Sequence, residues 1–224
     1  MKRSEVNSII KNSKDFFEEY KFRLPEWAYW SPENWKGQSE RCAEIITNNL
    51  GWDITDFGSN DFTREGLVLF TVRNGNLQKK DKTYCEKIMI ADEEQETPLH
   101  FHWNKMEDII NRGGGNLVLE LFIATPNGEL TDKPIDANID GIIYTVKPGE
   151  QLILKPGQSI CLKPYQYHRF YGQKGFGKVL IGEVSMVNDD ENDNRFYEQV
   201  GRFPAMKEDS KPLHLLVSDY QDYL

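Results

Sequence analysis

Two histidines that share one face of a predicted strand are the first sign of chemistry in this sequence. His100 and His102 lie in the run 98–103, and residues i and i+2 of a strand point to the same side. Two imidazoles on one face form half of a metal site, although the pair alone equally suits two half-buried polar residues at a strand end. Glu107 follows after a turn, and a return strand could bring its carboxylate to the same side. Borderline metals accept such mixed nitrogen and oxygen ligands.

A fourth ligand must come from elsewhere in the chain, and His168 is the natural candidate. It lies in KPYQYHRF, where a strand follows a turn that contains Pro164. A histidine in such a place is more often structural, but three other ligands favour its assignment to the metal. His214 has no such neighbours, so we interpret it as structural or exposed.

The spacing HxH-x4-E, followed later by a histidine after a proline turn, resembles the two motifs of the cupin superfamily. The second motif departs from the commonest form, because Pro164 lies four residues before His168 rather than five and no glycine stands between them. The segments EKIMIADEEQETPLHFHWNKMEDIINRGGGNLVLELF, GEVSMVNDDENDNRF and RFPAMKED are similar to the D-lyxose isomerase family. The likeness covers most of the chain, including its Trp-rich N-terminal segment.

This resemblance implies a mainly β fold, a cupin (jelly-roll) β-barrel with N-terminal helices. It implies one divalent metal per chain, usually Mn²⁺ with Co²⁺, Fe²⁺, Ni²⁺ or Zn²⁺ as alternatives, held by residues matching His100, His102, Glu107 and His168. The implied reaction interconverts D-lyxose and D-xylulose, with D-mannose and D-fructose as a further pair. A homodimer is also implied.

An aldose–ketose isomerisation moves a proton between C1 and C2 of an open-chain sugar, so a general base is required. A single metal suits proton transfer through a cis-enediol, because hydride transfer usually relies on two metals. Glu183 lies inside the apolar strand LIGEVSMV, where a charge needs a partner or a polar cavity. We predict Glu183 as the base and Lys105 as its acid partner or as a charge stabiliser, or the reverse. A nearby metal would lower the pKa of Lys105; an outward glutamate and a solvent-facing lysine are the alternatives.

Three further residues are predicted to bind the sugar. Lys87 alternates with Cys85 and Met89, so it contacts substrate if that face lines the barrel, and an outward position is equally compatible with the pattern. Asp193 and Arg195 end an acidic run that, by composition alone, is typical of a solvated loop. The family resemblance favours their binding of sugar hydroxyls.

The remaining chain predicts helices followed by strands. Helices are expected over residues 4–20 and 39–50, and Asn74-Gly75 is a strong hairpin signal. Strand-like runs, separated by Gly and Pro turns, are typical of a sandwich or barrel. They cover residues 66–72, 83–91, 98–103, 107–111, 117–125, 141–146, 151–155, 159–162, 168–171 and 178–187.

These elements predict a single cupin domain over residues 1–224. Residues 1–60 form a helical, Trp-rich extension, residues 61–190 the barrel core, and residues 191–224 a C-terminal loop and tail. Trp27, Trp30 and Trp35 are expected to cover one end of the barrel or a subunit contact rather than to stack on sugar. The apolar patch at 214–217 is expected to pack back on the domain. The run Gly113–Gly115 suits a tight turn better than a phosphate cradle, because no helix follows it.

Composition excludes several classes of partner. The chain has 224 residues and a net charge of −9, which disfavours nucleic acid. It has no apolar stretch of membrane-spanning length and no secretory signal, and its three cysteines form no CxxC pair, so we expect a cytoplasmic protein. Two other functions compete with the isomerase: an iron-dependent cupin dioxygenase and a non-catalytic sugar-binding cupin. The polar residues Lys87, Lys105, Glu183 and Arg195 favour a polyol site over the apolar surroundings typical of a dioxygenase.

Overall fold

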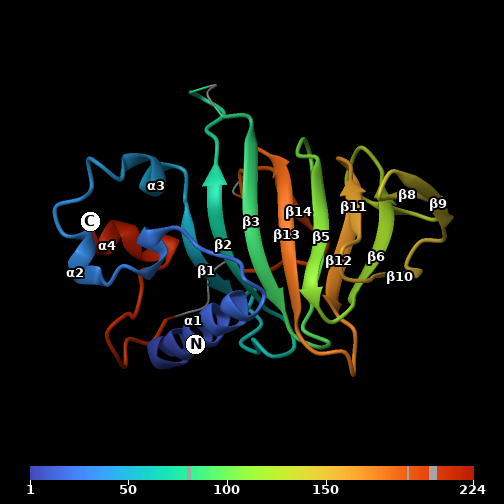
Figure 1. Ribbon diagram of the computed structural model, residues 1–224. Helices are drawn as coiled ribbons and strands as arrows, with labels where there is room; N and C mark the ends of the chain where they lie inside the picture. The colour runs from blue at the N-terminus through green and yellow to red at the C-terminus, as the bar shows by residue number, and fades with distance from the viewer. Residues whose placement is uncertain (80–81, 191, 202–205) are drawn as a thin grey trace.

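Two curved antiparallel sheets face each other, and helices cover the outer side of one of them (Figure 1). The computed structural model describes residues 1–79, 82–190, 192–201 and 206–224. The larger sheet has the order β1 (Gly51–Thr55), β2 (Leu67–Asn74), β3 (Tyr84–Ala91), β13 (Val179–Met186), β5 (Glu107–Gly114), β11 (Ser159–Leu162), β8 (Ile135–Ile139), β9 (Ile142–Val146). The smaller has the order β10 (Gln151–Leu154), β6 (Leu117–Ala124), β12 (Gln166–Gly172), β4 (Thr97–His102), β14 (Asn194–Phe196), with β7 (Leu130–Thr131) paired to β6. The fold is mainly β, as predicted.

The chain crosses between the sheets at the turn after β4. Strand β4 belongs to the smaller sheet and β5 to the larger one, so Glu107 reaches the histidines from the facing sheet rather than from a hairpin partner. The chain crosses a second time between β5 and β6. Gly113 and Gly114 end β5 and Gly115 lies in the connection that follows, so the turn is shorter than the predicted glycine run. These crossings place residues that are close in sequence on opposite walls of the barrel.

Strand alternation sorts the residues of the larger sheet into two environments. Ile88 and Leu180 point outward and pack under helix α1 (Arg3–Glu19), whose residues Val6, Ile10 and Phe17 are almost fully buried there. Their immediate neighbours in the chain, such as Lys87 and Ile181, point into the barrel. Because side chains alternate between the two faces of a strand, some charged side chains of the larger sheet point into the barrel.

The terminal layer comprises the N-terminal helices and the C-terminal tail, which lie together beside β1 (Figure 1). Its short helices are η1 (Glu26–Tyr29), α2 (Pro32–Trp35), α3 (Ala43–Thr47), η2 (Val217–Asp219) and α4 (Tyr220–Tyr223). Trp35 packs against Trp27, Trp30 and Tyr220, away from the barrel interior. Leu215 and Leu216 are buried in this layer. The tail therefore packs back on the domain, and the tryptophans have the packing role expected of them.

Several local predictions need correction. Every predicted strand run forms a strand, but helix α3 is much shorter than residues 39–50, and β1 lies inside the predicted helical extension. Asn74-Gly75 is not a two-residue turn, because Asn74 pairs with Cys85 and a longer loop joins β2 to β3. Strand β14 lies in the predicted C-terminal loop. Residues 202–205 of the RFPAMKED segment and residue 191 of the acidic run lie outside the described residues.

No helix among the described residues is long and apolar enough to cross a membrane.

Candidate active site

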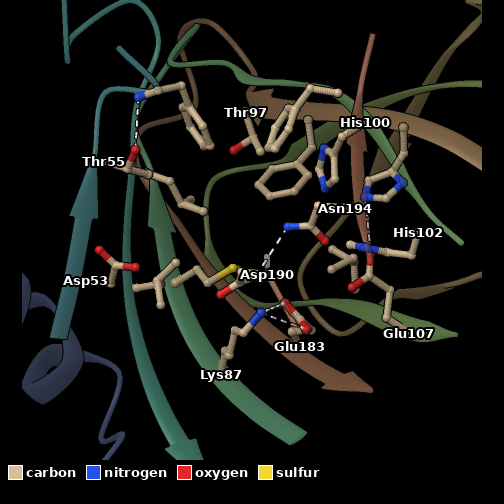
Figure 2. A pocket seen from close by; sticks show the side chains of 18 of the residues that line it. Asp53, Thr55, Lys87, Thr97, His100, His102, Glu107, Glu183, Asp190 and Asn194 are labelled. Atoms are coloured by element: carbon tan, nitrogen blue, oxygen red, sulfur yellow. Dashed lines mark hydrogen bonds and ion pairs between the residues drawn. The ribbon is translucent and has the colours of Figure 1, made fainter. Parts of the chain in front are cut away.

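A cavity of about 270 Å³ opens between the two sheets (Figure 2). Three histidines and Glu107 lie at one end, with lysines and a second glutamate beside them, and Asp53 and Thr55 lie at the other end. The apolar lining includes Phe57, Leu67, Leu69, Met89, Ile109, Phe170, Phe196 and Val200. The cavity is therefore polar at the histidine end and mixed elsewhere.

The three predicted histidine ligands converge on one point. His100 and His102 come from β4, and His168 comes from β12, where it pairs directly with His100. Their candidate ligand atoms all lie within 4.8 Å of one another. Nδ1 of His100 lies 2.7 Å from the carbonyl oxygen of Pro98, and Nδ1 of His168 lies 3.1 Å from that of Gln166. An N–H on each Nδ1 would leave Nε2 bare to act as a metal ligand.

Glu107 lies against two of the three histidines. Its Oε1 lies 3.2 Å from Nε2 of His102 and 3.1 Å from Nε2 of His168. Adjacent ligands of an octahedral metal with bonds of about 2.2 Å are separated by about 3.1 Å. Nδ1 of His102 and Nε2 of His168 are buried without a hydrogen-bond partner among the described residues. The 3.1 Å contact between His168 and Glu107 does not have the orientation of a hydrogen bond. The donor set therefore fits a divalent metal.

Electrostatics keep these groups in the protonation states that a metal needs. Burial, together with the other two histidines, lowers the pKa of His100 well below its usual value. Burial and the Lys105 ammonium lower the pKa of His102. Burial alone would raise the pKa of Glu107, but Lys105 and His102 outweigh it and hold the pKa well below the ordinary range. These shifts favour neutral imidazoles at His100 and His102 and an ionised carboxylate at Glu107.

A lysine–glutamate cluster adjoins the histidines. Nζ of Lys105 lies 2.8 Å from Glu107 Oε2 and 3.0 Å from Glu183 Oε1. Nζ of Lys87 lies 3.2 Å from the same Glu183 oxygen. All four side chains are at most 7% exposed. Glu183 and Lys87 thus both point into the barrel, and neither has the outward position that the sequence left open.

Burial and the neighbouring charges shift the pKa values of the side chains in this cluster. Burial alone would raise the pKa of Glu183, but the Lys105 and Lys87 ammonium groups lower it overall. Burial alone would lower the pKa of Lys105, but Glu107 and Glu183 raise it. The two carboxylates therefore oppose the lowering that a metal was expected to cause at Lys105.

The acidic loop contributes to the site differently from expectation. Asp193 accepts hydrogen bonds from the backbone N–H groups of Asn104 and Lys105, at 2.8 and 2.9 Å, so it holds the turn that carries Lys105. Arg195 is exposed and lies on β14 between Asn194 and Phe196, both of which line the cavity. Alternation along β14 therefore turns Arg195 to the other face of the strand, away from the cavity.

Sequence reasoning missed several cavity residues. Asp53 and Thr55 come from β1, Thr97 begins β4, and Asp190 and Asn194 come from the acidic loop. Asn194 donates to Asp190 across 3.3 Å (Figure 2). The in–out alternation of Asn194 to Phe196 was a usable signal, but it required recognition of a three-residue strand.

The fold and site define a cupin-type barrel with a candidate metal centre and a polar cavity. The structure is similar to two solved L-ribose isomerases, from Cellulomonas parahominis (TM-score 0.62) and Acinetobacter sp. DL28 (TM-score 0.61). Each likeness covers 92% of this chain and 98% of the other at 13% identity, which shows a shared fold.

The sequence narrows this class to one family. The family model for D-lyxose isomerase matches residues 1–220. Two relatives named D-lyxose/D-mannose isomerase, from Serratia proteamaculans and Escherichia coli O157:H7, are 47% and 45% identical over the full length of both chains. The chain belongs to the D-lyxose isomerase family and is a sugar isomerase. This confirms the predicted family, fold and enzyme class, and it decides against the dioxygenase and the non-catalytic binding protein.

Proposed function

We propose that the protein is a metal-dependent aldose–ketose isomerase that interconverts D-lyxose and D-xylulose, and D-mannose and D-fructose. The observation that carries this proposal is the position of Glu183, a buried carboxylate flanked by two lysines in the same cavity as the histidines. The names of the two full-length relatives support the choice of sugars. D-Lyxose and D-mannose share the configuration at C2 and C3, so one site suits both.

Four residues would hold the metal: His100, His102, Glu107 and His168. Mn²⁺ is our first choice, and Co²⁺, Fe²⁺, Ni²⁺ and Zn²⁺ suit the same nitrogen and oxygen donors. When bound, the metal would supply Lewis acidity that stabilises negative charge on the sugar oxygens O1 and O2.

Glu183 is the proposed general base. Its lowered pKa keeps the carboxylate ionised at neutral pH, ready to accept a proton. The carboxylate removes the proton from C2 of the open-chain aldose and returns it to C1, on the same face of the cis-enediol, while the hydroxyl proton moves from O2 to O1, to give the ketose.

The two lysines divide the remaining work. An ammonium group has three N–H donors, and those of Lys105 have three separate acceptors, in Glu107, Glu183 and Asn188. Among the described residues, the Lys87 ammonium contacts both carboxylate oxygens of Glu183, at 3.2 and 3.3 Å, and the amide oxygen of Asn188, at 2.8 Å. Lys87 lines the cavity and is proposed to contact a sugar hydroxyl or developing negative charge, whereas Lys105 is proposed to orient the two carboxylates.

Asp193 contributes to this proposal by fixing the turn that carries Lys105. Arg195 has no part in it, because it lies on the opposite face of β14.

The direct test is a reconstitution assay. Metal-free protein is loaded with Mn²⁺ and incubated with D-lyxose or D-mannose, and ketose is measured. We expect both ketoses to form, and their absence at full metal occupancy would overturn the proposal. In deuterated water the product should carry deuterium, while complete absence of deuterium would favour hydride transfer, or an unusually shielded base, over the free enediol proton route. His168→Ala should sharply lower metal content, and unchanged content would remove His168 from the ligand set.

We also propose that the protein is a cytoplasmic homodimer, on the basis of its resemblance to the family. Light scattering should give a mass near twice the 26.1 kDa of one chain. A mass of one chain at micromolar concentration would contradict the dimer.

A further inference from the structure

Asn188 lies where the two ammonium groups of the active site converge. Its side-chain oxygen Oδ1 is 2.8 Å from Nζ of Lys87 and 3.1 Å from Nζ of Lys105. Both lysines also contact Glu183. The two ammonium groups are thus bridged twice, once by the Glu183 carboxylate and once by the amide oxygen of Asn188.

The backbone of Asn188 is held by another buried asparagine. Its N–H donates to Oδ1 of Asn74 across 3.0 Å, and its carbonyl oxygen accepts from Nδ2 of Asn74 across 3.1 Å. Asn74 is 5% exposed and lies at the end of β2. This pair of bonds imitates the exchange of hydrogen bonds between adjacent antiparallel strands. It fixes the start of the acidic loop relative to the larger sheet.

A third asparagine, Asn48, exchanges hydrogen bonds with Asn74. Nδ2 of Asn48 donates to the carbonyl oxygen of Asn74 across 3.0 Å, and Nδ2 of Asn74 donates to that of Asn48 across 3.3 Å. Asn48 is 6% exposed and follows the last turn of α3. A chain of three amides therefore runs from the terminal layer to the lysines of the active site.

The amide group suits this position because it accepts hydrogen bonds without bringing charge. A carboxylate at the same place would compete with Glu183 for both ammonium groups, while an apolar side chain would leave buried N–H groups without an acceptor. The neutral oxygen anchors both lysines and leaves their positive charge directed at Glu183 and Glu107.

We propose that Asn188 is a positioning residue for the isomerisation, which holds Lys87 and Lys105 against Glu183, and that Asn74 acts through Asn188. This proposal rests on the proposed function, because it assumes that Glu183 is the base. Asn188 touches the catalytic side chains and is not itself required to touch the sugar.

The first test replaces Asn188 by alanine in the metal-loaded enzyme. Asn188→Ala should lower kcat about ten- to hundredfold, since a lost hydrogen bond to a charged group has effects of this size. KM, metal content and Tm should stay close to the wild type. Asn192→Ala is the matched control, because Asn192 lies in the same loop and its side chain bonds only to Asp189 among the contacts described. Equal kcat in the two variants would overturn the proposal.

A double-mutant cycle tests the link to Asn74. Asn74→Ala should lower kcat in the wild-type background and have almost no further effect in Asn188→Ala. Effects that multiply would show that Asn74 acts independently of Asn188, against the proposal.

Asn188→Asp covers the case in which the alanine variant does not fold, since it keeps the size and the acceptor oxygen. We expect reduced kcat, because the added carboxylate draws the lysines away from Glu183. Wild-type kcat in this variant would contradict the argument from charge. If the wild type itself isomerises no sugar, the proposed function fails; if it is active and Asn188→Ala is equally active, only this inference fails.

Discussion

Two clusters of buried charge among the described residues are built differently. In the terminal layer, Arg3 is 2% exposed and its planar guanidinium binds Asp219 at 2.9 and 2.7 Å and Glu208 at 2.6 Å. The partners match the fork of donors in an arginine. Every donor nitrogen of Arg3 is used, so this cluster is closed and ties the first helix to the C-terminal tail.

The cluster at the cavity uses lysines, which act as compact point charges without a fixed planar geometry. Lys87 and Lys105 share Glu183 and Asn188 as acceptors, and the group adjoins a cavity. The cavity gives a ligand access to this cluster, whereas the donors of Arg3 are taken by its two carboxylate partners. The comparison suggests that buried charge beside a cavity serves catalysis, and that buried charge whose donors are all paired serves stability. Three measurements test this.

The largest expected effect is on catalysis at Glu183. Replacing the proposed base by an amide of the same size, Glu183→Gln, should lower kcat about 10²- to 10⁴-fold with metal content preserved, because general-base catalysis is lost. Steady-state assay of the Mn²⁺-loaded enzyme with D-lyxose measures it.

Glu120→Gln is the matched control for this change. Glu120 is also buried beside a cation, Arg169 at 2.6 Å, but it lies outside the cavity. Its kcat should stay within about twofold of the wild type. A loss of less than tenfold in Glu183→Gln, or equal losses in both variants, would mean that Glu183 is not the base.

The second effect is on stability at Arg3. Arg3→Met removes one partner of a buried ion pair and leaves Asp219 uncompensated, so we expect a loss of about 3–5 kcal/mol in the free energy of unfolding. The kcat of the folded, metal-loaded enzyme should not change. Urea denaturation and the sugar assay separate the two quantities.

Arg23→Met provides the comparison, because Arg23 and its partner Glu18 are 71% and 58% exposed. Such an exposed pair contributes about 0–1 kcal/mol. Similar losses in both variants would show that the Arg3 cluster is no more stabilising than a surface pair, and a fall in kcat with Arg3→Met would show that it is not purely structural.

What the sequence predicted well was local. The spacing of His100 and His102 fixes their common face in any strand, and Glu107 follows after a single turn. Charge inside the apolar run around Glu183 pointed to a polar environment, and the structure provides one. His168 was harder, because it meets His100 only through the pairing of β12 with β4, and its assignment depended on the three other candidate ligands.

What the sequence did not predict depends on contacts between distant segments. Strand β1 is buried throughout because it pairs with β2 and is covered by α1, and five residues after a helix give little local signal of that. The acidic run has the composition of a solvated loop, yet Asp190 lines the cavity and Asp193 is bonded to the backbone at Lys105. Composition describes a segment's average environment, whereas the site depends on the direction of each side chain.

The smallest expected effect belongs to His214, which is buried in the terminal layer. Its Nε2 lies 2.8 Å from Nζ of Lys14 and its Nδ1 lies 2.9 Å from the carbonyl oxygen of Trp30. Burial lowers the pKa of His214, and the Lys14 ammonium adds to this, while the Trp30 carbonyl opposes it. The unfolded chain, with an ordinary histidine pKa near 6.5, therefore binds a proton more readily than the folded one.

Protonation of His214 thus favours unfolding, so its contribution to stability is present above pH 6.5 and is lost as the pH falls through the folded pKa. The free energy of unfolding should decrease between pH 7.5 and 5.5 more steeply in the wild type than in His214→Gln. Because His100 and His102 titrate in the same direction in both proteins, the difference between the two curves isolates His214. If the two curves of unfolding free energy against pH are parallel, the pKa of His214 does not change on unfolding. The terminal layer would then accept a protonated His214 beside the Lys14 ammonium.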